Sequence, residues 1–163
     1  VNVLLRNMGW IAQDASLPFF TDPTWARVTV IVVNIWVGVP YTLLQLTGVL
    51  QNIPGELYEA AKVDGANAFQ RFKSITLPML TPTTFFVSIM LTIACFKVFD
   101  LISVMTNGGP GRATNVLVYH IYNTAFINYE FGYASAISMV LFAIVLTITV
   151  IQFKTEKKWV SYM

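Results

Sequence analysis

Two long stretches of the chain contain no charged residue. Residues 28–50 form a stretch of 23 residues and residues 132–153 a stretch of 22, and neither contains Asp, Glu, Lys or Arg. A helix needs about 20 mainly apolar residues to cross a hydrocarbon core roughly 30 Å thick. Neither stretch alternates with a period of two, which favours helices over barrel strands. The two stretches therefore predict an all-α membrane protein.

The overall composition agrees with this class. Apolar residues make up 56% of the 163 residues and charged residues only 11%, against roughly 25% charged in an ordinary soluble domain. A disordered chain needs the opposite balance. The net charge of +2 gives no indication of nucleic-acid binding. The single cysteine, Cys95, excludes an internal disulfide framework and a cysteine-based zinc site, and the single histidine, His120, has no partner at metal-ligand spacing.

A third apolar stretch is less regular than the other two. Residues 82–96 are uncharged, Lys97 and Asp100 then intervene, and residues 101–105 are apolar again. Fifteen helical residues cover only about 22 Å. We therefore expect the third span to continue through both charges and to end near residue 105.

The basic residues predict the orientation of the spans, because Lys and Arg accumulate on the cytoplasmic side. One side carries Lys62, Arg71, Lys73, Lys154, Lys157 and Lys158, and the other carries Arg6 and Arg112, with Arg27 at a boundary. Trp25 and Trp159 lie near span ends, as an aromatic belt requires. The predicted order is an outer loop over 1–25, a span over 26–50, a cytoplasmic loop over 51–81, a span over 82–105, an outer loop over 106–131, a span over 132–153 and a cytoplasmic tail over 154–163.

An outer N-terminus normally requires that something upstream has crossed the membrane. Residues 1–25 read as a loop rather than as a signal peptide, because they lack a basic start followed by a short apolar run. We therefore expect a fragment that lacks an odd number of preceding spans. A chain that was cut deliberately is the alternative.

The cytoplasmic loop of about 30 residues is expected to be folded. Asn52 is a candidate helix cap, Pro54 suits an early helical position, and Gly65 suits a sharp bend. A second short helix is expected over 66–74, with prolines 78 and 82 closing the loop before the next span.

One face of the first loop helix is shallow, because two of its members are alanines. The residues at helical spacing on this face are Leu57, Ala60, Ala61 and Asp64. Such a face can enter a groove on a partner. It can equally well belong to a surface helix that only caps the bundle.

The same loop resembles the EAA loop of membrane subunits of bacterial binding-protein-dependent ABC importers. The matching pattern is Glu59-Ala60-Ala61, three residues, Gly65, nine residues and then Ile75-Thr76-Leu77-Pro78. Two further segments match, NIWVGVPY at 34–41 and TNGGP at 106–110. The similarity runs from about Asn2 to Phe153 and is closest to the carbohydrate branch, particularly the larger membrane subunit of the maltose system.

The resemblance implies the transmembrane domain of a type I ABC importer, with three of its spanning helices and a coupling helix. The coupling helix would dock on a separate ATP-binding cassette subunit, through Glu59, Ala60, Ala61, Asp64, Gly65, Leu77 and Pro78. That partner would bind ATP and Mg²⁺, so the chain itself would need no cofactor; it contains no GxxxxGK[ST] phosphate loop. A second permease subunit, identical or different, would complete the pathway. An extracytoplasmic solute-binding protein would face Asn107, Gly108, Gly109 and Pro110.

Polar residues in the spans are candidates for the solute path, because polar groups are costly in lipid. The candidates are Asn34, Gly38, Tyr41, Gln45, Lys97 and Asp100. The first three match family positions near the sugar, although Asn34 and Tyr41 could instead pack against neighbouring helices. Lys97 and Asp100 are spaced i, i+3, so they could pair with each other or line the path. The maltose-type subunit has asparagines where this chain has Cys95 and Val98, which argues against maltose but not against a sugar-like solute.

The function predicted from the sequence is that of a permease subunit passing a carbohydrate, polyol or sugar phosphate into the cytoplasm through the bacterial inner membrane. Two alternatives remain, a secondary transporter that uses Asp100 for proton coupling and an integral-membrane enzyme. The enzyme alternative lacks convergent catalytic groups. The residues do not identify the solute.

Overall fold

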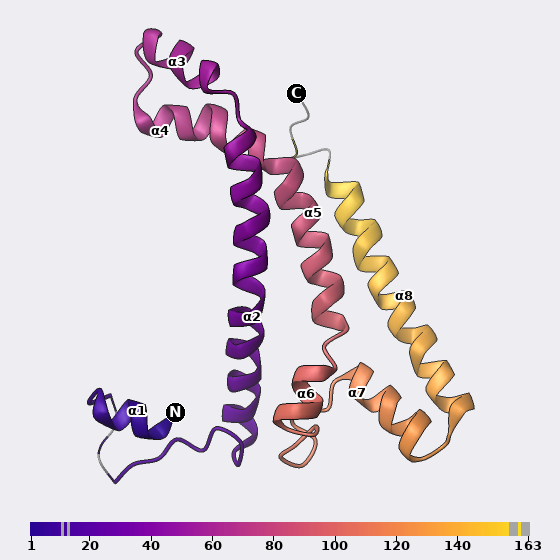
Figure 1. Cartoon of the computed structure of the whole chain (residues 1–163). Helices are drawn as coiled ribbons and strands as arrows, with labels where there is room; N and C mark the ends of the chain where they lie inside the picture. Colours follow the sequence, from indigo (N-terminus) through magenta and orange to yellow (C-terminus); the bar gives the residue numbers. More distant parts are fainter. Residues whose placement is uncertain (11, 13, 157–159, 161–163) are drawn as a thin grey trace.

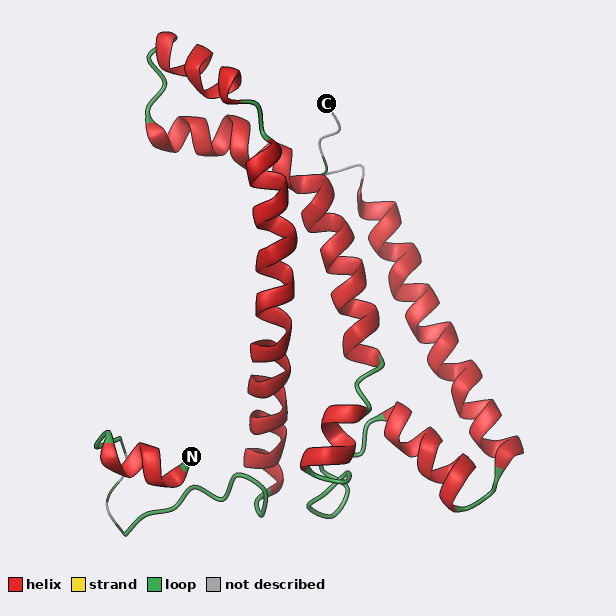
Figure 2. Cartoon of the chain, viewed as in Figure 1, coloured by secondary structure: helices red, strands yellow, loops and turns green. Residues whose placement is uncertain are grey.

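The computed structural model describes residues 1–10, 12, 14–156 and 160, and every regular element in this part of the chain is helical. Three long helices, α2 (Pro23–Asn52), α5 (Leu77–Phe96) and α8 (Phe131–Glu156), run in alternating directions and spread apart toward one end (Figures 1 and 2). Three helical stretches are long and apolar enough to span a membrane, namely Pro23–Asn52, Ala68–Phe96 and Phe131–Glu156. The all-α membrane class and its three spans are therefore confirmed.

Helix α2 contains the whole of the first expected span and extends it at both ends. The carboxylate of Asp22 caps the helix by accepting from the backbone N–H groups of Thr24 (2.9 Å) and Trp25 (3.0 Å). The prediction that Asn52 caps the following helix is wrong. Asn52 is the last residue of α2, and its side-chain amide donates to the Gly48 carbonyl at 2.8 Å.

The loop after α2 contains more helix than expected. Helix α3 (Gly55–Val63) follows Pro54, and α4 (Ala68–Arg71) passes through a π-helical turn, η1 (Phe72–Thr76), directly into α5. The prediction of a loop reaching residue 81 is therefore wrong. Pro78 does not end a loop, because it lies at the start of α5, directly after the π-helical turn η1 and within the continuous helical stretch Ala68–Phe96.

Helix α5 tolerates Pro82 but ends earlier than expected. The hydroxyl of Thr81 donates to the Pro78 carbonyl at 2.7 Å. This carbonyl would normally accept from the backbone N–H of residue 82, which proline lacks. The helix stops at Phe96, and α6 (Asp100–Met105) follows as a separate short helix. The prediction of a continuous span to residue 105 is thus wrong. The length needed to cross a membrane is instead gained at the other end of the helix, where α4 and η1 continue into α5.

The short elements gather at the two ends of the long helices. Helices α3 and α4 lie at the end where α8 finishes, and α1 (Asn2–Asn7), α6 and α7 (Leu117–Tyr122) lie at the opposite end (Figure 1). A small core of Val30, Ile102 and Tyr119 joins α2 to α6 and α7. A second π-helical turn, η2 (Asn123–Ile127), leads toward α8.

The long helices make few contacts with one another. Helices α5 and α8 are linked by a hydrogen bond from the Gln152 amide to the Thr92 hydroxyl (2.9 Å) and by an edge-on contact of Phe85 with Phe153. The most apolar 18-residue window of α2 contains no buried residue at all. These faces must therefore contact lipid or further helices. Lys157, Lys158 and Trp159 of the expected cytoplasmic tail lie outside the described residues.

Candidate functional site

The EAA residues lie on a helical hairpin, here called the α3–α4 hairpin (residues 55–71), that projects beyond the end of α2 and α5 (Figure 1). Glu59 and Ala60 are exposed on α3, and Ala61 is half-buried beside them. Leu77 and Pro78 lie apart from them, in the first turn of α5. The structure thus brings the EAA triplet, Asp64 and Gly65 together and places Leu77 and Pro78 at the base of the hairpin.

The bend of the hairpin depends on Gly65. Its φ of +78° lies in the left-handed region, which glycine adopts without strain. The backbone N–H groups of Gly65 and Ala66 donate to the carbonyls of Lys62 (3.0 Å) and Ala61 (2.9 Å), closing the end of α3. No atom outside the local backbone lies within 4 Å of the position that a Cβ would take. Glycine is therefore required here for backbone conformation rather than for space.

The second helix of the hairpin begins with a reciprocal cap that we did not predict. The Gln70 N–H donates to the side chain of Asn67 at 2.9 Å, and the Asn67 N–H donates to the side chain of Gln70 at 2.8 Å. This capping box could have been found from the spacing Asn-x-x-Gln. At the base of the hairpin, the Tyr58 hydroxyl lies 2.8 Å from the Thr76 hydroxyl and ties α3 to η1.

The α3–α4 hairpin exposes large apolar side chains. Val63 is 88% exposed and Phe69 is 72% exposed, and no residue of α3 or α4 is buried. Such side chains in water favour association with another surface. The hairpin therefore combines a fixed local shape with an apolar outer surface, which suits docking into a partner.

A groove of about 370 Å³ lies between α2 and α5 at the level of the spans. Asn34 and Gly38 line it from α2, and Leu91 and Cys95 line it from α5. The groove thus brings together two of the candidate path residues and Cys95. Tyr41 is 57% exposed and does not line this groove.

The remaining polar residues of the spans are placed separately. Gln45 is half-buried, and its side-chain oxygen has no hydrogen-bond partner among the described residues. Lys97 and Asp100 are both exposed and lie on either side of the break between α5 and α6. In the described part of the chain no ion pair joins them, because they do not share a helix as the i, i+3 spacing assumed.

The turn at 107–111 is tightly folded. Asn107, Gly108 and Gly111 all have positive φ, and the Gly109–Pro110 peptide bond is cis. A Cβ added to the buried Gly108 would lie 2.9 Å from Cε1 of Tyr119. The Thr114 hydroxyl donates to the Gly109 carbonyl at 2.8 Å, which closes the turn. The segment resembling the binding-protein-facing loop is therefore fixed against α7.

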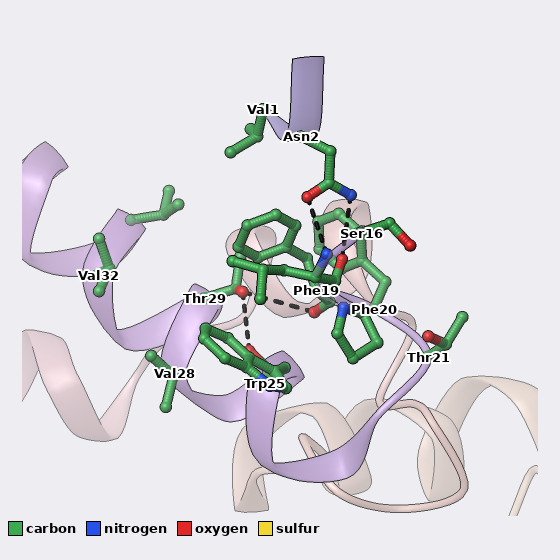
Figure 3. A pocket seen from close by; sticks show the side chains of 13 residues that line it. Val1, Asn2, Ser16, Phe19, Phe20, Thr21, Trp25, Val28, Thr29 and Val32 are labelled. Carbon is green, nitrogen blue, oxygen red and sulfur yellow. Dashed lines mark hydrogen bonds between the residues drawn. The ribbon is translucent and has the colours of Figure 1, made fainter. Parts of the chain in front are cut away.

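Two further hollows lie at the end of the long helices where α1, α6 and α7 gather, and the sequence predicted neither of them. The larger, of about 720 Å³, is mainly apolar and lies between residues 16–21 and the start of α2 (Figure 3). The Asn2 side chain holds this segment in place. Its oxygen accepts from the Leu17 N–H (3.0 Å), and its amide N–H donates to the Leu17 carbonyl (3.1 Å). The smaller hollow, of about 220 Å³, is polar and is lined by Asn107, Gly108, Gly111, Arg112, Asn115, Tyr119, His120, Asn123 and Asn128.

Comparison with known proteins agrees with this arrangement. Residues 3–158 match the family described as the inner membrane component of binding-protein-dependent transport systems. The sn-glycerol-3-phosphate transport system permease protein UgpA of Brucella abortus is 42% identical over 160 residues, which cover 98% of this chain and 53% of that protein. The trehalose/maltose transport system permease protein MalF of Thermococcus litoralis is 42% identical over 138 residues, covering 83% of this chain and 45% of that protein.

A solved structure shows the same fold. The crystal structure of a bacterial ABC transporter involved in the import of the acidic polysaccharide alginate has a TM-score of 0.77 and 25% sequence identity, covering 96% of this chain and 55% of that one. The chain thus spans about half the length of these relatives. It belongs to the inner membrane components of binding-protein-dependent ABC transport systems, in the carbohydrate branch that includes UgpA and MalF.

Proposed function

We propose that this chain is the part of an ATP-driven importer's permease that carries the coupling hairpin and one wall of the solute path. The observation that carries the proposal is the EAA spacing on a hairpin that projects beyond the spans and exposes apolar side chains. The solute class is a carbohydrate, polyol or sugar phosphate. It is supported by relatives whose names refer to glycerol 3-phosphate, trehalose and maltose.

The proposed orientation follows the basic residues. The α3–α4 hairpin carries Lys62 and Arg71, and α8 ends at the same end of the molecule with Lys154 in its last turn (Figure 1). This end is the cytoplasmic side by the distribution of Lys and Arg. The outer side then holds α1, α6 and α7.

The proposed coupling step uses the α3–α4 hairpin as a lever. Glu59, Ala60, Ala61 and Asp64 of the hairpin enter a cleft of a separate ATP-binding cassette subunit, which binds ATP and Mg²⁺ and carries out hydrolysis. Because α4 continues through η1 into α5, a displacement of the hairpin is transmitted to a span without an intervening flexible loop. The spans then move as rigid bodies between inward-open and outward-open states.

The proposed solute path runs along the groove of Asn34, Gly38 and Cys95. The Asn34 side chain can both donate to and accept from solute hydroxyls, and Gly38 leaves room beside it. A second permease subunit covers the exposed face of α2, where Tyr41 lies, and reaches the half-buried Gln45 one turn further along. The turn at 107–111 faces the solute-binding protein that delivers the solute.

The coupling assignment is tested with Glu59→Ala in the full-length subunit, assembled with its partners. Solute uptake and stimulated ATP hydrolysis should both fall at least about tenfold, the effect of losing roughly 1.4 kcal/mol of interaction. The matched control is Glu56→Ala, which removes an exposed carboxylate from the first turn of the same helix. Membrane insertion should be normal in both variants. Unchanged uptake by Glu59→Ala would refute the coupling role.

The path assignment has its own test. Asn34→Leu should raise the KM for uptake while leaving basal ATP hydrolysis and assembly as in the parent. Asn7→Leu is the control, because Asn7 lies at the end of α1 and lines neither the groove nor the outer hollows. An unaltered KM in Asn34→Leu would remove this residue from the path.

A further inference from the structure

The polar hollow at the outer end gathers six polar side chains from three consecutive segments. Asn107 and Arg112 come from the turn after α6, Asn115 from the link to α7, and His120, Asn123 and Asn128 from α7, η2 and the residue after it. We call this hollow the outer polar pocket. Within the described residues, none of the six side chains makes a hydrogen bond to another part of the protein. Polar groups that converge without bonding one another are available to a ligand.

The chemistry of the lining favours a ligand that both donates and accepts hydrogen bonds. The Arg112 guanidinium offers only donors, whereas each of the asparagine carboxamides offers donors and an acceptor. A hydroxyl group can donate to a carboxamide oxygen and accept from a carboxamide N–H or from Arg112, whereas a phosphate dianion can only accept.

The outer polar pocket is held in shape before any ligand arrives. Gly108 lines it and lies so close to the Tyr119 ring that no side chain fits between them. The Arg27 side chain of α2 donates to the Ala113 carbonyl at 3.1 Å, and the Thr114 hydroxyl closes the preceding turn. The wall that carries Arg112 and Asn115 is therefore fixed at both sides. Such preorganisation lowers the conformational cost of binding.

The lining also distinguishes a small solute from a protein surface. The centre of a protein–protein interface is usually apolar or aromatic, with charged residues depleted. Here the only large apolar ring is that of Tyr119, which is buried, and every other side chain of the lining is polar or charged. A concave, almost entirely polar hollow of about 220 Å³ is better suited to a small hydroxylated molecule.

We propose that the outer polar pocket binds a sugar ring or short polyol through its hydroxyl groups, as an entry site distinct from the groove of Asn34 and Gly38. The inference rests on the proposed function, because a solute must be released at this end of the molecule for an entry site to be filled. Asn115 and Asn123 hold the hydroxyls, and Arg112 and His120 line the same hollow. The solute then passes from this site toward the spans.

The test uses the complete transporter in nanodiscs, without ATP and without the solute-binding protein. Saturation-transfer NMR measures the affinities of trehalose and of mannitol, in an Asn34→Leu background that removes the contribution of the inner groove. Asn115→Leu should weaken binding by about threefold to tenfold, the loss expected for one hydrogen bond. Asn7→Leu is the matched control and should leave the affinity unchanged. Asn123→Leu, at a half-buried position of the same pocket, serves as the second variant if Asn115→Leu does not assemble.

Three results would overturn the entry site. The first is no detectable binding of either probe, and the second is equal affinity in the parent and in both pocket variants. The third is displacement of both probes by equimolar inorganic phosphate, which would make the pocket an anion site. Weaker docking of the empty solute-binding protein to Asn115→Leu, with probe affinity unchanged, would also refute it in favour of a protein contact.

The proposed function can fail independently of the entry site. Probe binding that depends on Asn115 in a transporter without ATP-driven uptake would support the outer polar pocket and refute the importer. ATP-driven uptake with probe binding indifferent to Asn115 and Asn123 would support the importer and refute the pocket.

Discussion

The two connections between the long helices are folded in opposite ways. The α3–α4 hairpin contains no buried residue and is shaped by local hydrogen bonds such as those of Asn67 and Gln70. The outer connection, residues 97–130, buries Ile102 and Thr124 to 1% exposure. It is also tied to α2 across 86 residues of sequence by the bond from Arg27 to Ala113.

Under the proposed function, this difference separates a moving part from a fixed one. Apart from the Tyr58–Thr76 bond at its base, the hydrogen bonds that shape the α3–α4 hairpin lie within it. The outer connection keeps its shape only while α2, α6 and α7 stay together. Under the proposed function, the α3–α4 hairpin must keep its internal structure while it moves relative to the rest of the molecule. The entry site must instead be held in place by the helices around it. Substitutions in the two connections should therefore have different kinds of effect.

The largest effect is expected for Gly108→Ala in the outer connection. The new Cβ would lie 2.9 Å from Cε1 of Tyr119, on a backbone with φ of +80°. Overpacking and the left-handed conformation together should cost about 2 to 4 kcal/mol of unfolding free energy. Chemical denaturation of the purified protein in detergent measures the loss. The control is Gly111→Ala, which has a similar φ of +60° but no neighbour within 4 Å, and should lose about 1 kcal/mol. Equal losses would show that Tyr119 does not constrain the turn.

A smaller loss is expected for Thr114→Val in the same connection. Thr114 is buried, and its hydroxyl donates to the Gly109 carbonyl while lying 2.7 Å from the Thr106 hydroxyl. Removing it leaves a carbonyl and a hydroxyl without this partner, which should cost about 1 to 3 kcal/mol. The loss should be seen in global denaturation, since the turn is continuous with the small core. The control is Thr84→Val, because the Thr84 hydroxyl donates to the Leu80 carbonyl of its own helix. This variant should change the unfolding free energy by less than about 0.5 kcal/mol.

Features that depend on local interactions could be predicted from the sequence, whereas features that depend on tertiary contacts could not. Gly65 and the spans were predictable because a bend and an apolar helix are local properties. The capping box of Asn67 and Gln70 was equally local and was overlooked. The start of α5 at Leu77 was not predictable, because the prolines at 78 and 82 look like helix breakers, whereas Thr81 compensates for one of them.

The outer polar pocket shows where the sequence gives least information. Its six polar side chains span residues 107–128 and come together only through the turns around α7. Asparagines scattered over 22 residues have no period that identifies a pocket. The burial of Gly108 against Tyr119 likewise depends on a tertiary contact. Residues whose role depends on such contacts were therefore missed or were placed only by resemblance.

In the α3–α4 hairpin, Asn67→Ala should have a moderate but local effect. Losing the reciprocal cap should destabilise α4 by about 1 kcal/mol. Because the hairpin shares no buried core with the rest of the molecule, the midpoint of global denaturation should not move. Amide hydrogen exchange should instead become faster over residues 67–71. A shifted midpoint with unchanged local exchange would contradict the independence of the two connections.

The smallest effect is expected for Tyr58→Phe, at the base of the hairpin. The Tyr58 hydroxyl bonds the Thr76 hydroxyl across a partly buried contact that links α3 to η1. Its loss should cost only about 0.5 to 1 kcal/mol, yet it loosens the joint through which the hairpin is attached to α5. Spin labels on Val63 and Phe86, both exposed, should therefore give a broader distance distribution, although global stability hardly changes. Tyr129→Phe, at an exposed outer position whose hydroxyl has no partner among the described residues, should leave that distribution as it is. If Tyr58→Phe also left it unchanged, the stiffness of the lever would come from the continuous backbone of α4, η1 and α5, and the coupling step would depend on that helix alone.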